Sequence, residues 1–347
     1  MKSVILSERE IRFWGFTPQK ISSAMPLFYN PAMITNRDIA ILFLKAWGKK
    51  NLQICDPLAG TGVRSLRFLK EAGEYSKIVY ANDKSHFFIR SMKKNLLLNN
   101  IPSTKLSLSH KEASVWMLES SGFDYIDIDP FGSPNPFLDA SIRRLSRRGI
   151  LAVTATDTSA LCGTHPRACL RKYWAIPQRI VHMHELGLRI LIRKVQLIGA
   201  QYDRALLPLV SYADQHYMRV YLCVDKKKNA VDAILKQHGM WNQAGPLWLG
   251  PMQDSKILES MHRLCPLEWK KTVQLLGILC NESHISSLGF HDIHTLARKY
   301  KLASLPSVPV IISALNQQGF VAARTHLSQN GIKTNCSEEE FVRILQQ

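Results

Sequence analysis

The chain has 347 residues, 46% hydrophobic and 21% charged, which is typical of a globular protein long enough for two domains. Lysine and arginine total 45 against 27 acidic residues, so the formal net charge is +18 and nucleic acid is the first partner to consider. The 7 cysteines include no Cys-x-x-Cys pair, and no apolar run could serve as a signal peptide or span a bilayer, which disfavours secreted, disulfide-framed and membrane proteins and favours the cytoplasm.

Strand-like and helix-like patterns alternate between residues 39 and 154. The predicted strands are 52–56, 77–81, 106–109, 123–129 and 149–154, and the predicted helices are 39–47, 63–72, 85–99 and 135–145. This alternation predicts an α/β fold with a mostly parallel, Rossmann-like sheet and helices on both faces. Ligands bind such sheets beyond the carboxyl ends of the strands, where several aspartates of this chain stand.

The pattern changes in the second half of the chain. Two strand-like runs, 205–210 and 218–224, surround a polar turn and predict a hairpin at the edge of the sheet. Three lysines at 226–228 then break the pattern. We therefore predict two domains, 1–225 with the sheet and 226–347 as a smaller helix-rich α+β domain.

The first candidate site is an Asp-x-x-x-Gly-x-Gly turn that runs from Asp56 to Gly62, between a strand and a helix. Gly60 and Gly62 permit a tight turn and a close approach of the backbone to a ligand. Asp83 ends the next strand, where a carboxylate accepts hydrogen bonds from both hydroxyls of a ribose. Ser65 stands where a dinucleotide site has its third glycine, and the two carboxylates suit a cationic sulfonium better than a pyrophosphate. The turn favours S-adenosylmethionine and a class I methyltransferase fold.

The second candidate site is the segment Asp127–Pro134, Asp-Ile-Asp-Pro-Phe-Gly-Ser-Pro, after the fourth predicted strand. Methylation of an exocyclic amine on a base requires a group that orients the amine and accepts its hydrogens. Asp129 supplies a carboxylate, Pro130 fixes the turn and Phe131 supplies a ring for stacking. Many amino-methyltransferases use an Asp/Asn-Pro-Pro-Tyr/Phe turn, of which this segment looks like a shortened version. Asp127 alternates with apolar neighbours and fits a supporting hydrogen-bond role better than that of a base.

These motifs belong to a pattern that spans nearly the whole chain. The sequence resembles the tRNA (guanine-26 N2)-dimethyltransferase family. The matching segments are 28–31, 36–38, 56–64, 127–134, 155–158, 161–163, 212–213, 216–220, 245–251, 323–326 and 331–334. The Asp-Pro-Phe-Gly-Ser-Pro and Arg-Thr-His segments are specific to the family, whereas Gly-x-Gly turns are common.

The resemblance implies two methyl transfers from S-adenosylmethionine to N2 of guanine 26 in tRNA. We predict transfer of one or both methyl groups, with tRNA as the partner and no obligate protein partner. It implies cofactor contacts at Arg37, Arg64, Asp83, Glu112 and Ala113. Glu112 stands where the family more often has aspartate. On the residues alone, the two arginines fit the methionine carboxylate of the cofactor or a charge that faces solvent or tRNA about equally well.

The resemblance makes Asp129 the catalytic carboxylate and places the target guanine between Phe28 and Phe131. This arrangement suits a base that has left its stack and is held between apolar faces. Phe28 fits core packing nearly as well.

The chain departs from the family at one point. Many members carry a zinc-binding set of cysteines shortly before the Gly-Pro-Leu-Trp segment, but residues 224–244 contain no cysteine, and His238 is the one soft ligand there. We therefore predict no structural metal.

Clusters of basic residues predict how RNA would be held, because Lys and Arg contacts to phosphates fix register without reading sequence. The clusters are 143–148, 167–172, 189–194, 226–228, 270–271 and 298–301.

Two alternative functions stay open. The first is an amino-methyltransferase of another tRNA guanine, of adenine or of protein glutamine. The second is a non-catalytic RNA-binding protein with a degenerate methyltransferase domain, which the intact site motifs disfavour.

Overall fold

The computed structural model describes residues 3–16, 25, 27–214, 216–302 and 304–346. The chain forms two compact units, each assembled from segments that are distant in sequence. The first unit contains residues 1–157, 194–209 and 219–236, and the second contains 158–193, 210–218 and 237–347. The functional division at residue 225 stays a prediction.

A seven-stranded sheet with the order β5-β4-β3-β6-β7-β9-β8 organises the first unit, and the ends of β8 and β9 at residues 210–218 belong to the second. Its strands are β3 (Leu52–Asp56), β4 (Ser76–Asn82), β5 (Leu106–Ser109), β6 (Phe123–Ile128), β7 (Leu145–Ala155), β8 (Ala205–Asp214) and β9 (Tyr217–Asp225). The five strands from β3 to β7 are parallel, as predicted. The predicted pair of strands is confirmed at the edge, where β9 and β8 are neighbours.

The strand order creates a switch point between β3 and β6. From β3 the chain proceeds outward through β4 to β5, and it then returns to build β6 and β7 on the other side of β3. The turns that follow β3 and β6 therefore diverge at adjacent strand ends. In a doubly wound sheet this crevice is where ligands bind, and both sequence motifs lie at it.

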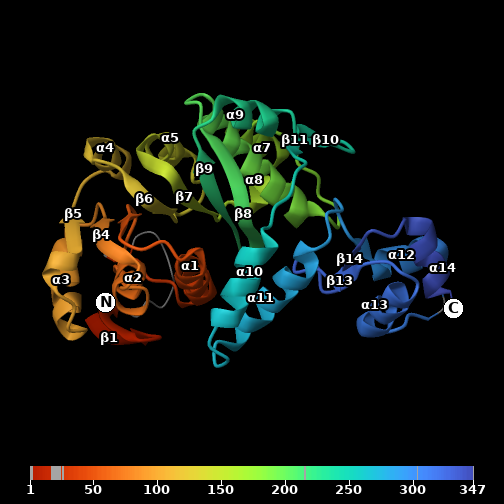
Figure 1. Ribbon diagram of the computed structural model, residues 1–347, viewed down its shortest axis with the longest axis horizontal. Coiled ribbons are helices and arrows are strands. Elements are labelled where there is room, and N and C mark those ends of the chain that lie inside the picture. The colour runs from red at the N-terminus through yellow and green to blue at the C-terminus, as the bar shows by residue number, and fades with distance from the viewer. Residues whose placement is uncertain (1–2, 17–24, 26, 215, 303, 347) are drawn as a thin grey trace. The chain divides into compact units, whose positions relative to one another are not determined.

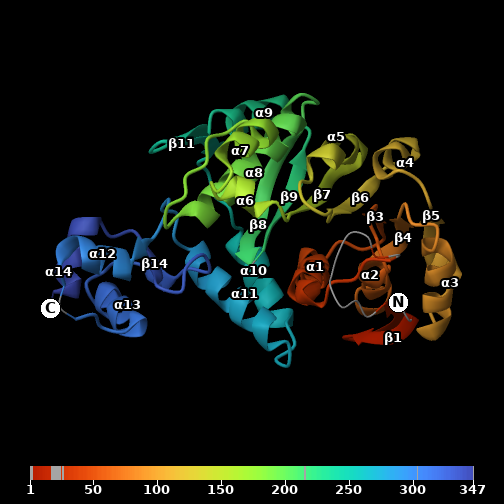
Figure 2. The ribbon, with the colours of Figure 1, turned by 180° about the vertical axis from the view of Figure 1, so that it is seen from behind.

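Helices cover both faces of the sheet in the first unit. They are α1 (Ile34–Trp47), α2 (Val63–Glu71), α3 (Phe88–Leu98), α4 (Ala113–Glu119), α5 (Asn135–Arg144) and α9 (Lys228–Leu235), with short 3-10 turns at Pro31–Met33 and Ser103–Lys105. Both views show α1 and α2 on one side of β6 and β7, with α4 and α5 together on the other side (Figures 1 and 2).

Helix α1 begins five residues before its predicted start at residue 39. The polar residues Asn36, Arg37 and Asp38 precede the predicted start, but they lie within α1 and are buried. They are tolerated there because other elements supply hydrogen-bond and ionic partners for each of them.

A hairpin that the sequence analysis did not predict precedes α1. Strands β1 (Ser3–Glu8) and β2 (Ile11–Phe16) pair antiparallel. The backbone N–H of Trp14 donates to Oδ1 of Asn95 at 2.8 Å, and that of Arg12 donates to Oδ1 of Asn99 at 2.9 Å. Helix α3 and its C-terminal cap thus supply hydrogen-bond acceptors for the edge of β2.

The second unit is rich in helices, as predicted for the C-terminal part. Its elements are α6 (Thr158–Leu161), α7 (Pro166–Tyr173), most of α8 (Met183–Ala200), β10 (His238–Trp241), β11 (Ala244–Trp248), α10 (Ser255–Leu264), α11 (Lys270–Ser283), β12 (His291–Asp292), α12 (Ile293–Tyr300), α13 (Val308–Gln317), β13 (Ala322–Arg324), β14 (Gly331–Thr334) and α14 (Glu338–Leu345). The sheet β12-β14-β13 packs its central Ile332 with Ile311, Leu315 and Phe341 in one apolar core. Across the described residues, no helix is long and apolar enough to cross a membrane.

Candidate active site

The glycine turn after β3 has the backbone conformation that its sequence requires. Gly60 and Gly62 have φ values of +57° and +79°, in the left-handed region. A Cβ on Gly60 would lie 2.7 Å from the carbonyl oxygen of Phe28, and a Cβ on Gly62 would lie 1.9 Å from Sδ of Met92. Only glycine therefore fits either position, and both glycines are buried at the switch point.

Asp83, at the end of β4, holds this turn from the neighbouring strand. Its Oδ2 accepts a hydrogen bond of 2.8 Å from the backbone N–H of Gly60, and its Oδ1 accepts one of 2.9 Å from that of Ser85. Each carboxylate oxygen keeps further acceptor capacity. The half-buried carboxylate thus stands directly beside the glycine turn, as the cofactor prediction requires.

Asn82 is a structural residue that the sequence analysis did not single out. Its buried amide donates to the carbonyl oxygens of Pro57 and Lys111, and its Oδ1 accepts from the N–H of Lys111. This side chain joins the turns that follow β3 and β5. Its place directly before Asp83, at a strand end, was the available signal.

Asp56 faces the interior. Its Oδ2 accepts a hydrogen bond of 2.7 Å from the hydroxyl of Ser65, and only 2% of the residue is exposed. Burial raises the pKa of Asp56 to about 7, although the charge of Arg64 and the bond from Ser65 lower it. The side chain anchors the start of α2 in this structure, and its prediction as a cofactor contact remains a prediction.

Arg64 joins the two motifs. Its Nη2 donates to Oδ2 of Asp129 and, at 2.8 Å, to Oδ1 of Asn36, while its Nη1 lies 3.3 Å from Oδ2 of Asp127. The guanidinium is buried, whereas Asp129 is half-buried at the end of β6. A helix that starts at the glycine turn thus fixes the position of the carboxylate proposed for catalysis.

Asp127 lies deeper in the interior than Asp129 and supports the Arg64–Asp129 pair. It is fully buried and accepts hydrogen bonds from both terminal nitrogens of Arg219, at 2.9 and 2.6 Å, and from the hydroxyl of Tyr125 at 2.8 Å. Burial would raise the pKa of Asp127, but the charges of Arg219 and Arg64 outweigh it and lower that pKa. The supporting role predicted for Asp127 agrees with this geometry. Arg219, on β9, belongs to a matching segment, but its role was not predicted.

The two predicted aromatic residues touch each other. The ring centroids of Phe28 and Phe131 are 4.1 Å apart, with an angle of 71° between the planes. A base held between two rings needs about 7 Å, the sum of two carbon–carbon contacts. The sandwich therefore requires the rings to separate, and it stays a prediction. Phe131 is 52% exposed, so its ring is accessible for stacking.

The remaining predicted cofactor contacts have partners of their own. Arg37 is buried and donates to both carboxylate oxygens of Glu8 and, at 3.0 Å, to the carbonyl oxygen of Asn30. Glu112 is exposed and caps α4 by accepting from the N–H of Val115 at 2.8 Å, while the neighbouring Ala113 is buried. A cofactor carboxylate that binds Arg37 would have to share it with Glu8.

The prediction that the basic cluster 189–194 faces RNA is wrong for two of its residues. Arg189 is only 3% exposed, its guanidinium pairs with Glu185 and donates to the carbonyl oxygens of Trp248 and Gly250, and Lys194 is also buried. These two cations lie in the interior, where they are not available to a phosphate. The described residues contain no group of three metal-ligating side chains, and the absence of a metal stays a prediction.

Comparison with known proteins identifies the class to which this fold and site belong. A solved structure of Trm1 from Pyrococcus horikoshii with S-adenosyl-L-methionine matches with a TM-score of 0.89 and 34% identity over 99% of both chains. The fold and the strand-end site define a class I, S-adenosylmethionine-dependent methyltransferase.

The family of N2,N2-dimethylguanosine tRNA methyltransferases matches residues 7–244 and 237–346. A tRNA (guanine(26)-N(2)/guanine(27)-N(2))-dimethyltransferase from Aquifex aeolicus is 35% identical over 95% of this chain and 92% of its own. A tRNA (guanine(26)-N(2))-dimethyltransferase from Pyrococcus horikoshii is 36% identical over 92% of both chains. The chain belongs to the N2,N2-dimethylguanosine tRNA methyltransferase family, which confirms the resemblance, the cofactor and the fold class.

Proposed function

We propose that this protein transfers methyl groups from S-adenosylmethionine to the exocyclic N2 of guanine 26 in tRNA. The observation that carries this proposal is the geometry at the switch point. Asp129 is held by Arg64 at the end of β6, and the glycine turn follows the neighbouring strand β3. A cofactor on the turn and an amine on the carboxylate would then meet at adjacent strand ends.

The residues of this crevice fit the cofactor. Glycine at positions 60 and 62 lets the turn pack tightly at the strand end, because a Cβ at either position would collide with its neighbours. Asp83 beside it has acceptor capacity for the ribose hydroxyls. We assign Arg37 and Arg64 to the carboxylate of the methionine part. Glu112 and Ala113 are assigned as further cofactor contacts. The bound cofactor supplies a methyl group activated by a positively charged sulfur.

Asp129 acts on the amine. Its carboxylate accepts a hydrogen bond from the N2 amine and so directs the nitrogen lone pair toward the methyl carbon. As the nitrogen–carbon bond forms, the carbon–sulfur bond breaks and its electron pair stays on sulfur. The nitrogen then carries a positive charge, and Asp129 takes its proton and passes it to solvent. Pro130 keeps the carboxylate at the strand end, and Phe131 and Phe28 hold the guanine by stacking.

The decisive experiment is methyl transfer from labelled S-adenosylmethionine to an unmodified tRNA transcript. Matched transcripts with adenine at position 26 or at position 27 separate the two specificities named among the relatives. We expect label in the wild-type transcript, none in the position-26 variant, and N2-methylated guanosine as the labelled nucleoside. Equal label in all three transcripts would move the target to another nucleotide.

Asp83→Ala should lower affinity for S-adenosylmethionine by about 10–100-fold, the effect of losing hydrogen bonds to a charged acceptor. Titration calorimetry of the variant and the wild type measures it. Asp83→Asn is the matched control, because its amide oxygen still accepts from Gly60 N–H and preserves the turn. Unchanged affinity in Asp83→Ala would remove the ribose assignment.

A further inference from the structure

Helix α7 in the second unit presents a mixed stripe of arginine and apolar side chains. Cys169 and Tyr173 are fully buried on its inner face. Arg167, Leu170, Arg171 and Trp174 follow at the spacing i, i+3, i+4 and i+7, so they share the outer face. Leu170 is 54% exposed and Trp174 is 48% exposed. We call these four residues the α7 surface.

The charge of this region is one-sided. No aspartate or glutamate occurs from residue 158 to residue 184, and Glu185, which follows, is buried and paired with Arg189. Arg167 and Arg171 are exposed, and neither pairs with an acidic side chain in the described part of the chain. Like charges four residues apart on a helix disfavour the helix. The helix dipole stabilises Arg171 in the last turn of α7 but not Arg167 in the first turn.

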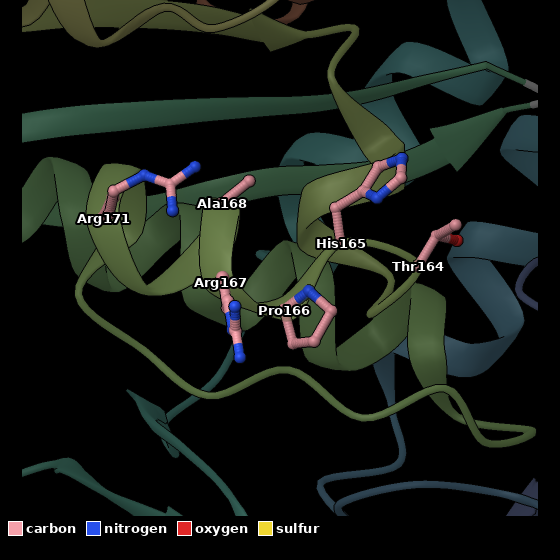
Figure 3. A pocket seen from close by; sticks show the side chains of 6 residues that line it. All are labelled: Thr164, His165, Pro166, Arg167, Ala168 and Arg171. Atoms are coloured by element: carbon pink, nitrogen blue, oxygen red, sulfur yellow. The ribbon is translucent and has the colours of Figure 1, made fainter.

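The two arginines also share a concave part of the surface. They line a recess of about 470 Å³ together with Thr164, His165, Pro166 and Ala168 (Figure 3). Figure 3 shows both arginine side chains projecting from α7. A recess bordered by guanidinium groups suits phosphate oxygens, which arginine binds through paired N–H groups.

Trp174 has a backbone conformation that favours glycine. Its φ is +56°, in the left-handed position that ends α7, and its carbonyl oxygen accepts a hydrogen bond of 3.2 Å from Nη1 of Arg193. Bulky residues rarely occupy this position, where glycine is the usual choice. A side chain kept at the cost of backbone strain points to a use for its ring, and about half of this residue is exposed.

We propose that the α7 surface binds the tRNA substrate, with Arg167 and Arg171 on backbone phosphates and the Trp174 ring stacked on an unpaired base. The inference rests on the proposed function for its partner. Arginine beside an exposed aromatic ring is the combination that binds single-stranded nucleotides without reading sequence. A protein partner is disfavoured, because the apolar side chains are interleaved with cations that no acidic neighbour on this surface balances.

The first test is tRNA binding by Arg167→Gln/Arg171→Gln over a series of salt concentrations. Loss of two phosphate contacts should reduce the slope of log K against log salt by about 1.4–1.8 and raise the KM for tRNA about tenfold. Affinity for S-adenosylmethionine should not change. Lys77→Gln/Lys105→Gln removes the same charge at the amino ends of β4 and β5, opposite the proposed active site, and should leave the slope unchanged. An unaltered slope in the arginine variant would overturn the proposal.

The second test uses the backbone strain at Trp174. Trp174→Gly removes the ring but suits the left-handed backbone, so the Tm should be maintained or rise. Its tRNA affinity should fall about tenfold with an unchanged salt slope, and Trp174→Phe should retain most of the affinity. Wild-type tRNA affinity in Trp174→Gly would overturn the proposal, as would a sedimentation change that shows the surface joining two protein chains. If the wild type methylates no tRNA, the proposed function fails instead.

Discussion

Asp129→Ala is expected to lower kcat for tRNA methylation by about 10²–10⁴-fold, the range for loss of a positioned acid or base. Affinity for S-adenosylmethionine should change much less than kcat, because Asp129 follows β6 whereas the cofactor turn follows β3, although Arg64 loses its bond to Asp129. The local structure should persist as well, since Arg64 keeps Asn36 and Asp127 as partners. Single-turnover methylation and calorimetric titration measure the two quantities independently.

Asp129→Asn distinguishes the two roles of the carboxylate. The amide has nearly the same shape and one acceptor oxygen, so it can orient the amine, but it cannot take a proton in the neutral range. Activity as low as that of Asp129→Ala would assign the proton transfer to Asp129, and a partial recovery would assign mainly orientation. Loss of cofactor binding together with a lowered unfolding midpoint would show that the residue is structural, contrary to the mechanism.

The sequence was sufficient for the parts of the site that depend on local chemistry. Strands 52–56 and 106–109 were predicted with their observed bounds, because short apolar runs between polar turns have few alternatives. Gly60 and Gly62 were predicted because only glycine adopts such a turn readily. The strand-end position of Asp83 follows from the same pattern.

Long-range pairing was not predictable. Glu8 lies in a segment with Arg9, Glu10 and Arg12, which reads as a solvated surface, yet it is buried and accepts hydrogen bonds from Arg37 and Arg67. Such a residue can be recognised only when the packing of the hairpin against α1 and α2 is known.

The same limit applies to cations. Arg189 lies in a basic stretch with Arg193 and Lys194, and composition alone does not show that Arg189 and Lys194 are buried. The burial of Arg189 depends on Glu185 one helical turn earlier and on carbonyl oxygens about sixty residues later in the chain. Partner geometry, rather than composition, decides which cations face solvent.

Arg219 is the cation whose loss should be most damaging to the fold. It is fully buried and separated from Asp127 by 92 positions in the sequence. The two side chains meet because β6, which carries Asp127, and β9, which carries Arg219, lie on either side of β7. Arg219→Met would leave the Asp127 carboxylate in the interior with Arg64 as its remaining cation. Breaking a buried ion pair from one side typically costs about 3–5 kcal/mol. The urea midpoint should fall accordingly, while Arg90→Met, a change at an exposed arginine, should shift it little.

The double variant Asp127→Asn/Arg219→Met tests whether charge is the cause. It leaves neither charge in the interior, so it should be more stable than the sum of the single variants predicts.

The pH dependence of stability tests the same role of charge. Arg219 and Arg64 lower the pKa of Asp127, so their stabilisation is present above the unfolded pKa and is lost as the pH falls through the folded pKa. Without Arg219, burial raises that pKa, and the carboxyl group takes up a proton more readily. The difference in urea midpoint between the wild type and Arg219→Met should therefore narrow as the pH falls from neutral toward about 4. A constant difference across this range would mean that Arg219 stabilises the sheet by packing against Tyr221 and not by its charge.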